Sequence, residues 1–556
     1  PSAALPSRIR GTPAAIGGAA LGCFAALGVF IFINTHVWNE YRTPDQRDRY
    51  MADYEKALLA YEHVPQPDVT ALRFDIDIHP NGPAMAVTGH YDLTNHQNVP
   101  LDRVHIRMET RQTKLLDLRI DGATLERDYP RFHYRIYKLA RPLAPGATIR
   151  LDFRTERGQR GFANAANTGL GIFPNGTFVN KDDFAPSIGM TRDGLLQDRI
   201  KRRKYGLTPE LRMAKLEDRS AQAQNYIHAG WTTADITVTT DADQTPIAPG
   251  DRVSDVTHDG RRTARFVTSA PVLNFFAVQS ARYAERHATY DGPNGPIALT
   301  VYYDPHHPWN VDRMLNGFKA GLKYYEPNFG PYQFHYARIL EFPAYSSFAQ
   351  AFAGTIPYSE GIGFIANLSK PDNIDYVTYV TAHELGHQWW AHQVVGADMQ
   401  GATMLSETLA QYSALMTMRE LYGPDKIRRF LKYELDQYLR ARGAERLEEE
   451  PLERVENQQY IHYRKGSVVM YLLQDRLGAD RVNAGLRQLL ADYRFKGAPW
   501  PRSLDLVGDF RAQAGQIGDG APAGQQLITD LFEKITLYDL RTVSGVVTRR
   551  PDGRFD

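Results

Sequence analysis

The longest apolar run of the chain lies close to its N-terminus. Residues 14–33 read AAIGGAALGCFAALGVFIFI and contain no charged side chain. A helix of this length rises about 30 Å, which matches the hydrocarbon core of a bilayer. We therefore predict a transmembrane segment with its flanks in residues 1–40. The alternatives are a signal peptide, whose apolar region is usually only about 7–15 residues long, and a buried helix of a soluble protein.

Two different patterns follow this apolar run. In residues 41–67, Thr43, Pro44 and Gln46 form the start signal of a capped helix, and we predict a short stalk helix there. In residues 68–290, apolar and polar residues alternate, with turn residues between the alternating stretches. A period of two is typical of half-buried strands, so this region is predicted to be an all-β, sandwich-like domain.

Helical spacing takes over in residues 291–540, which we predict to form a mainly helical domain. The predicted helices cover residues 311–325, 374–395, 404–422, 466–477 and 525–535. Residues 541–556 resemble half of a β-hairpin and are predicted to begin a truncated β segment. The fold class expected is therefore α+β and multidomain. The start at Pro1 and the half hairpin suggest that the sequence belongs to a longer chain.

Composition narrows the possible chemistry. The 556 residues include 65 Lys and Arg against 64 Asp and Glu, so the chain lacks the basic excess of nucleic-acid-binding proteins. The single cysteine, Cys23, excludes a disulfide framework and a thiolate metal cluster, so a bound metal must use histidines and carboxylates. A basic stretch, residues 201–204, is predicted to be a surface loop, with contact to lipid headgroups as the alternative.

The sequence His383-Glu384-Leu385-Gly386-His387 is the strongest chemical signal in the chain. On a helix, the two histidines share a face and can bind one metal ion, while Glu384 can act on a water beside it. A catalytic zinc has three protein ligands and one open position. Glu407 lies beside the apolar stripe of the next predicted helix, where an unpaired carboxylate is costly. We therefore predict a His₂Glu site for one zinc ion per chain.

These motifs resemble a known family. Residues 383–390, HELGHQWW, are similar to the signature of the gluzincin aminopeptidases of the aminopeptidase N and leukotriene hydrolase type. Residues 406–412 resemble the family segment that carries the third zinc ligand, residues 463–466 its Y-x-K-G motif, and residues 329–332 its F-G-x-Y segment. The matches follow the family's order across residues 68–537. The resemblance implies a β-rich domain followed by a thermolysin-like zinc peptidase domain.

The resemblance also implies roles for individual residues. Glu384 would be the general base, and Tyr463 would donate to the oxyanion of the tetrahedral intermediate. Glu360 takes the place of the family's glutamate that binds the substrate's free α-amine; the alternative is an ordinary loop carboxylate, which would leave zinc hydrolysis but not the selection of a free amine. Two departures stand out. Nineteen residues separate His387 from Glu407, one more than is usual in the family, and the G-x-M-E-N strand is absent as such from residues 354–363.

The sequence thus predicts a membrane-anchored zinc aminopeptidase that acts on peptides and binds no nucleic acid. The alternative is an accessory, non-catalytic module of a membrane transporter, because a span joined to this peptidase type resembles bacterial fusions with ABC-type permeases. In that case the partners would include transmembrane regions of the same longer chain. The expected location is the bacterial inner membrane, with the catalytic domain on an undetermined face.

Overall fold

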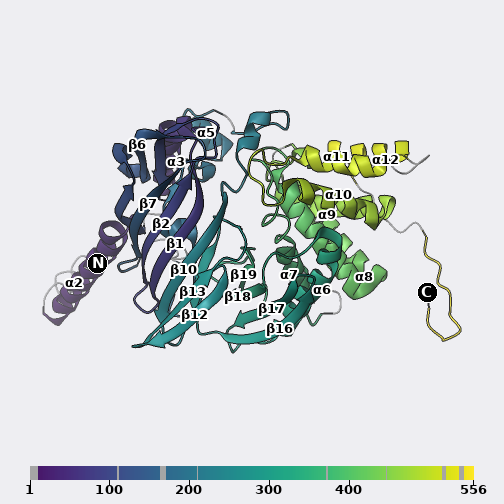
Figure 1. The fold of residues 1–556 in the computed structure, drawn as a ribbon. Helices are drawn as coiled ribbons and strands as arrows, with labels where there is room; N and C mark the ends of the chain where they lie inside the picture. Colours follow the sequence, from purple (N-terminus) through teal and green to yellow (C-terminus); the bar gives the residue numbers. More distant parts are fainter. Residues whose placement is uncertain are drawn as a thin grey trace, which may run out of the picture.

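The structure is a computed structural model, and it describes residues 11–108, 112–162, 171–208, 211–370, 373–445, 448–515, 521–537 and 544–555. A single projecting helix, a β-rich part and a helical part follow one another along the chain (Figure 1). The β sheets stand between the projecting helix on one side and the helical part on the other. The predicted α+β multidomain fold is confirmed.

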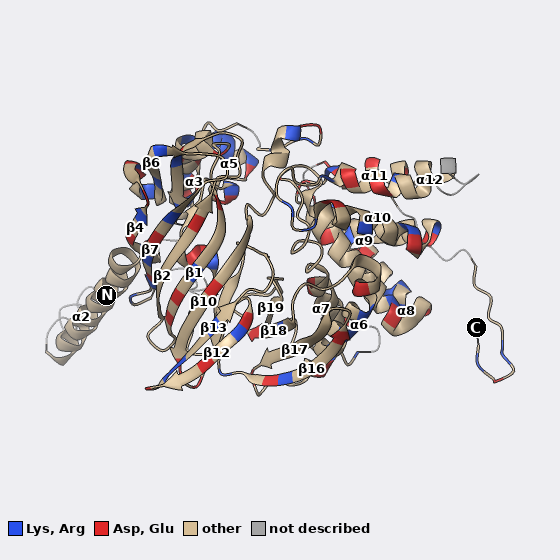
Figure 2. Ribbon diagram, viewed as in Figure 1, with Lys and Arg blue, Asp and Glu red and all other residues tan. Residues whose placement is uncertain are grey.

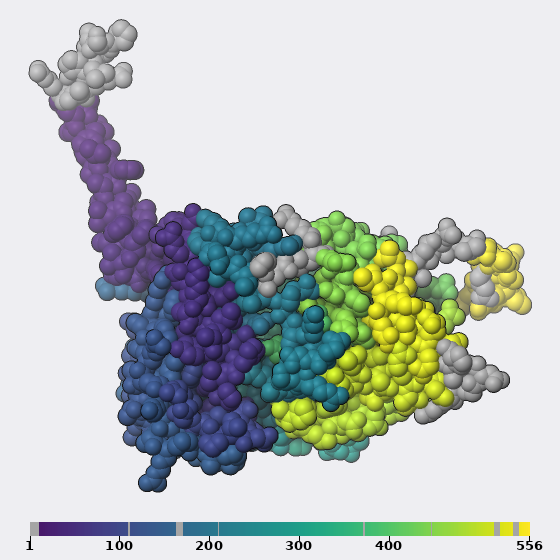
Figure 3. Space-filling model, turned by 90° about the horizontal axis from the view of Figure 1, so that it is seen from above, coloured from purple at the N-terminus to yellow at the C-terminus, as the bar shows by residue number. Residues whose placement is uncertain are grey.

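The projecting helix is α2 (Thr12–Phe32), and none of its residues is buried. Figure 3 shows it extending away from the body of the protein. Together with the π-helical turn η2 (Ile33–Trp38) it has the length and the apolar composition of a membrane span. At its base, the Phe162 N–H donates to Asn34 Oδ1 (3.1 Å), and the Arg160 guanidinium lies 4.2 Å from the Trp38 ring.

The next helix, α3 (Pro44–Leu58), begins with the predicted capping box. The Gln46 N–H donates to Thr43 Oγ1 (3.2 Å), and the Thr43 N–H donates to Gln46 Oε1 (2.9 Å). The helix is not a free stalk, however. Tyr54 and Leu58 are buried against Phe132 and neighbouring residues of the β-rich part. Its apolar face therefore docks on the β domain and fixes the base of α2 beside it.

The basic stretch 201–204 is part of a short helix, α5 (Arg199–Lys204), which corrects the predicted loop. Arg202 is buried and makes a bidentate ion pair with Glu55 of α3, at 2.7 and 2.8 Å. The neighbouring lysines pair with aspartates on the same helix: Lys201 with Asp48 (3.0 Å) and Lys204 with Asp45 (2.9 Å). The charges of this stretch therefore bind α5 to α3, and Figure 2 shows the two helices close together. The partners lie at least 147 positions earlier in the chain, so local sequence did not reveal them.

Among the residues that the structure describes, the β-rich part contains three sheets. An eight-stranded sheet has the order β12-β13-β10-β1-β2-β7-β4, with β14 beside β10, and its β1–β10 pair is parallel. The other two sheets have the orders β5-β6-β3-β9 and β11-β15-β8. The alternation read from the sequence is confirmed in β1, where Leu72, Phe74, Ile76 and Ile78 are all buried.

The strands of this part are β1 (Asp68–His79), β2 (Ala84–Thr94), β3 (Leu101–Arg107), β4 (Thr113–Ile120), β5 (Ala123–Tyr129), β6 (Tyr134–Leu143), β7 (Thr148–Gly158), β8 (Thr177–Asn180), β9 (Ser187–Ile188), β10 (Trp231–Asp241), β11 (Thr245–Ile247), β12 (Asp251–His258), β13 (Arg261–Val267), β14 (Val272–Leu273) and β15 (Ala277–Ala281). Short helical segments between them are α4 (Lys181–Phe184), η4 (Pro130–Phe132), η6 (Arg192–Gly194) and η7 (Arg219–Ala223); η3 (Leu59–Tyr61) follows α3.

The helical part is built on a four-stranded sheet of its own, β16 (Ala284–Gly292), β17 (Gly295–Tyr303), β18 (Tyr336–Phe342) and β19 (Thr355–Ser359). The last three strands are parallel. Because β16 already belongs to this sheet, the second part of the molecule begins a few residues before the predicted boundary at 290/291. Two helices of this part, α6 (Val311–Phe329) and α7 (Tyr376–Gly386), join the same hydrophobic core as these strands.

The helix predictions are confirmed only in part. The helix α7 ends at Gly386, nine residues before the predicted end at 395, because the chain continues there in turns, and the helices over residues 479–493 and 503–514 were not predicted. The helix α9 (Gly466–Leu477) has the predicted ends. The helix α8 (Leu409–Ala444) bends at Gly423, where φ is 81°, and continues past the predicted stop because Pro424 suits the first turn of a new helix. The other elements are α10 (Ala479–Tyr493), α11 (Ser503–Ala514), α12 (Ala521–Ile528), η8 (Met404–Thr408), η9 (Leu452–Arg454), η10 (Tyr460–Lys465) and η12 (Thr529–Glu533). In the last stretch, Arg549 and Phe555 form one β-bridge, while residues 541–543 lie outside the described residues.

The buried Arg202–Glu55 pair yields a stability prediction. Removing one partner leaves an uncompensated buried charge, so Arg202→Met should lower the free energy of unfolding by about 3–5 kcal/mol, measured by urea denaturation. Arg203→Met, at an exposed neighbouring position, should change it by less than about 0.5 kcal/mol. The double variant Arg202→Met/Glu55→Met should recover most of the loss. Equal stability of the two single variants would contradict a structural role for the pair.

Candidate metal centre

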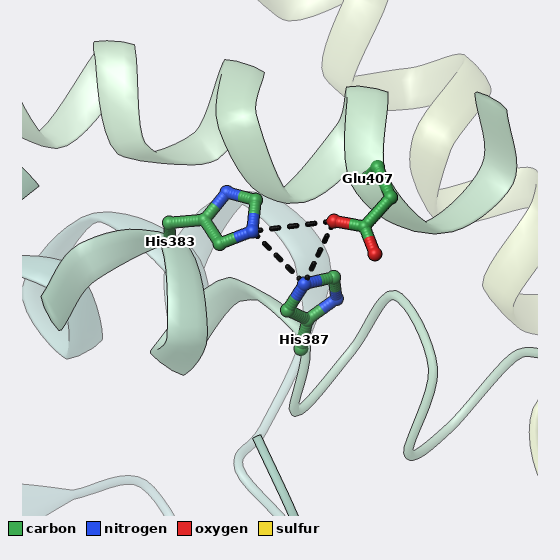
Figure 4. Close-up of side chains that lie close together, drawn as sticks. All are labelled: His383, His387 and Glu407. Atoms are coloured by element: carbon green, nitrogen blue, oxygen red, sulfur yellow. Dashed lines mark hydrogen bonds and ion pairs between the residues drawn. The ribbon is translucent and has the colours of Figure 1, made fainter. Parts of the chain in front are cut away.

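Three predicted ligands meet at one point (Figure 4). His383 lies in the last turn of α7, His387 immediately follows that helix, and Glu407 comes from η8. The two Nε2 atoms lie 3.0 Å apart, and Glu407 Oε2 lies 3.3 Å from His383 Nε2 and 3.2 Å from His387 Nε2. The helical spacing of the histidines and the start of the next helix therefore produce a compact triangle of donor atoms.

The donor set fits a zinc ion. Ligand atoms of a tetrahedral zinc, each about 2.0–2.1 Å from the metal, lie about 3.3 Å from one another. Within the part of the chain that the structure describes, Glu407 Oε2 is a buried carboxylate oxygen that makes no well-formed hydrogen bond. Such an atom calls for a positive partner. Two imidazoles and one carboxylate are a common catalytic zinc set, and a cation here would satisfy the orphaned oxygen.

Burial and the contacts among the side chains shift the pKa values of the carboxyl groups at the site. Burial disfavours the charged form of Glu407, but the imidazoles of His387 and His383 outweigh it and hold the pKa of that carboxyl well below its usual range. Burial raises the pKa of Glu384 to about 7, which suits a proton acceptor near neutral pH. His387 Nδ1 lies 3.2 Å from the Trp390 carbonyl oxygen, a contact that turns Nε2 toward the donor triangle.

Close packing of small residues positions the third ligand. Glu407 lies in a π-helical turn, which holds one more residue than an α-helical turn and so offers a place for the longer spacing after His387. The preceding histidine helix approaches α8 at Gly386, where an added Cβ would lie 3.2 Å from Ala410 Cα. On the other side, the Thr408 hydroxyl donates to the His462 carbonyl oxygen (2.5 Å).

Tyr463 also reaches this site. It lies in η10, and its ring centroid is 5.6 Å from that of His383. Burial raises the pKa of Tyr463, and the neighbouring Glu407 carboxylate raises it further. The phenol therefore remains protonated and able to donate. The structure thus brings together His383, Glu384, His387, Glu407 and Tyr463, which sequence reasoning selected from three separate motifs.

Three residues of the site were missed by sequence reasoning. Gln388 accepts a hydrogen bond from the Gly354 N–H (2.8 Å) and donates to the Phe352 carbonyl oxygen (3.0 Å), which ties the metal-binding segment to the chain before β19. The Ala351 N–H lies beside the Glu384 carboxylate and partly offsets the effect of burial on its pKa, and His392 Nε2 lies 3.1 Å from the Ala351 oxygen. Gln388 lies inside the HELGHQWW motif, which could have revealed it. Ala351 contributes only its backbone, so its side chain gives no signal in the sequence.

Glu360 lies elsewhere. It is in the turn after β19, and its carboxylate lies 4.0 Å from His307 Nδ1, in a cluster with the buried carboxylate of Glu341. This cluster is at the carboxyl end of the parallel strands. Gln388 meets the chain at the opposite end of β19, next to Gly354. The structure does not bring Glu360 to the metal ligands, and its role in binding an amine stays a prediction from the resemblance.

Comparison with known proteins identifies the region that carries this site. Residues 313–508 match the family model described as the peptidase family M1 domain. The chain therefore carries a peptidase family M1 domain. The match contains the donor triangle, Glu384 and Tyr463, so the predicted resemblance to the gluzincin aminopeptidases is confirmed.

Individual relatives agree with this assignment. Endoplasmic reticulum aminopeptidase 1 of Mus musculus is 26% identical over 208 residues, which are 36% of this chain and 22% of that protein. The alanine/arginine aminopeptidase of Saccharomyces cerevisiae is 23% identical over 372 residues, 61% of this chain and 41% of that protein. The matched stretch thus spans about a fifth of the first relative's length. These relatives give no support to the transporter-module alternative.

The fold of the M1 domain and its β-rich neighbour has a counterpart among solved structures. A crystal structure of an M1 zinc metallopeptidase from Deinococcus radiodurans, a mutant bound to a Tyr-Ser-Ala substrate, superposes with a TM-score of 0.59 and 18% identity. The superposition covers 87% of this chain and 99% of that one. The two-part arrangement of β-rich and helical regions is therefore a known fold.

Proposed function

We propose that this protein is a zinc metallo-aminopeptidase, anchored in a membrane by its N-terminal helix, that hydrolyses residues from the N-termini of peptides. The observation that carries this proposal is the convergence of Glu384 and Tyr463 on the donor triangle of His383, His387 and Glu407. A general base, an oxyanion donor and a His₂Glu zinc set are the parts that peptide hydrolysis by an activated water requires. The aminopeptidase names of the sequence relatives support the same activity.

Each residue of the site has a separate role in hydrolysis. Zinc, when bound, supplies a Lewis acid that polarises the scissile carbonyl and makes a water molecule more acidic. Glu384 accepts a proton from the attacking water and passes it to the leaving nitrogen. The Tyr463 hydroxyl donates to the carbonyl oxygen as negative charge develops there. The Ala351 N–H beside the Glu384 carboxylate favours the charged form of that carboxylate.

The central test separates the general base from the metal ligands. Glu384→Gln removes the proton acceptor but leaves the three donor atoms, so it should keep about one zinc per chain and lose at least about 10²–10⁴-fold in kcat on amino-acid arylamides. His387→Ala should lose both the zinc, measured by mass spectrometry of the metal, and the activity. A Glu384→Gln protein that hydrolyses arylamides at the normal rate would refute the assignment.

The oxyanion role of Tyr463 has a matched control in the same helical turn. Tyr463→Phe removes the donor and should lower kcat by about 10²–10³-fold with zinc content unchanged. Tyr460 is also buried in η10, and its hydroxyl makes no hydrogen bond within the described residues. Tyr460→Phe should therefore leave kcat within about twofold. Equal losses in the two variants would indicate a packing effect.

Membrane anchoring rests on α2. This helix exposes its apolar side chains along its whole length, and Trp38 follows at the position where interfacial aromatic residues usually stand. We therefore infer an anchor that holds the M1 domain at a membrane. The relatives include an endoplasmic reticulum aminopeptidase, so the location in a bacterial inner membrane stays a prediction from the sequence.

Fractionation of cells that produce the chain tests the anchor. The protein should stay in the membrane fraction after washing at alkaline pH, with residues 12–38 intact by N-terminal analysis. A charged variant, Leu21→Lys/Phe24→Lys, should move into the soluble fraction with its arylamide activity preserved, because a lysine near the bilayer centre costs about 2.5–3.5 kcal/mol. Recovery of a soluble wild-type protein that lacks residues 12–38 would identify a cleaved signal instead.

A further inference from the structure

A hairpin extends the sheet of the M1 domain beyond β19. Residues 348–352 run antiparallel to β19: the Gln350 N–H donates to the Pro357 oxygen (3.1 Å), the Ser359 N–H to the Phe348 oxygen (3.0 Å), and the Phe352 N–H to the Thr355 oxygen (2.9 Å). The turn contains Gly354 with φ at 61°. Residues 348–352, called here the outer strand, therefore form the edge of the sheet.

The outer strand passes directly beside the general base. The Ala351 N–H lies beside the Glu384 carboxylate, and its oxygen lies 3.1 Å from His392 Nε2; by the hydrogen-bond register both groups point away from β19. Two residues earlier, Ala349 presents its N–H and oxygen on the same outward side, and neither makes a hydrogen bond within the described residues. An open strand edge of this kind can pair with an extended peptide through backbone hydrogen bonds. A bound peptide would then lie across the metal centre.

This outer strand carries no acid. Between Glu341 and Glu360 the sequence contains no aspartate or glutamate. From the hydrogen-bond register, Ala351 lies opposite Ile356, and Glu360 follows four residues later, about 13 Å along an extended chain. Glu360 there faces His307 and Glu341.

The carboxylates closest to the reaction are already engaged. Glu384 lies beside the outer strand and acts as base, and Glu407 belongs to the donor triangle. The β-rich part contributes Tyr226, a neutral side chain that lies beside Ser406 and Glu407. A substrate ammonium bound beside the outer strand would lose its hydration and gain no carboxylate partner. A free amine therefore brings no binding advantage.

From this arrangement we propose that the site also cleaves peptides whose N-terminus is blocked or extended. The outer strand holds the peptide by its backbone, and no carboxylate on that strand selects a free α-amine. In the reaction the scissile C–N bond breaks, the oxygen of water joins the carbonyl carbon, and one proton of that water reaches the leaving nitrogen through Glu384. The products are a carboxylate-ended peptide and a peptide with a new amine. This inference rests on the proposed peptidase function.

The experiment compares one internally quenched octapeptide with a free N-terminus and the same peptide acetylated. We expect kcat/KM for the two peptides to agree within about threefold in the purified full-length protein in detergent, with mass spectrometry locating cuts that release an acetylated fragment. A loss of more than about 100-fold on acetylation would overturn the proposal. Hydrolysis of neither peptide, with zinc bound, would refute the peptidase function itself.

A variant tests the remaining carboxylate that could select an amine. Glu360→Gln should leave the ratio of kcat/KM for free and acetylated peptides unchanged. A selective loss of at least about tenfold on the free peptide would instead make Glu360 an ammonium partner and overturn the proposal. Glu384→Gln, measured in parallel, should abolish cleavage of both peptides and so assigns every cut to this metal centre rather than to a contaminating peptidase.

Discussion

The contact of the Glu407 carboxylate with two imidazoles is the interaction on which the M1 domain depends. A buried carboxylate without a positive partner is costly, and one oxygen of Glu407 makes no well-formed hydrogen bond in the described residues. Three elements are therefore held together around one charge: the end of α7, the π-helical turn η8 and the π-helical turn η10. Small residues at Gly386 and Gly466 allow these backbones to approach, and large side chains at either position would separate the ligands.

The β-rich part supports the chemistry indirectly. Phe348 and Phe352 of the outer strand turn their rings toward aromatic residues of that part, with Phe178 and Phe275 at centroid distances of 4.9–6.4 Å. The other face of the hairpin is tied to the metal-binding segment by Gln388. The outer strand is thus packed between the two parts of the molecule. This contact gives a physical reason for the helical part and the β-rich part to occur together.

Local signals predicted much of this structure. The capping box at Thr43, the alternation in β1 and both ends of α9 depend on neighbouring residues, and the structure has them as expected. The ligand set could also be predicted from the sequence. Histidines four residues apart share one face of a helix, and a carboxylate beside an apolar stripe needs a positive partner. The charges of 201–204 could not be interpreted alone, because their partners lie on α3.

The hairpin before β19 was not predicted for a different reason. Strand register determines which of residues 343–363 lie beside the metal ligands. Contacts with Gln388 and with β19 decide that register, and the local sequence pattern does not. Alignment on a glycine motif selected Glu360, whereas the backbone of Ala351 is what meets Glu384. Motifs with side-chain chemistry could therefore be read from the sequence, and backbone chemistry could not.

The docking of α3 on the β domain has a consequence for how the enzyme would work at a surface. Because α3 is packed and ion-paired along its length, it cannot act as a flexible tether for the catalytic part. With α2 in a bilayer, the β domain would hold the helical part, which carries the metal centre, in a fixed position relative to the anchor (Figure 1). Such a protein would meet peptides only in the orientation that the anchored β domain gives to its metal centre, and not over the range that a flexible tether would allow.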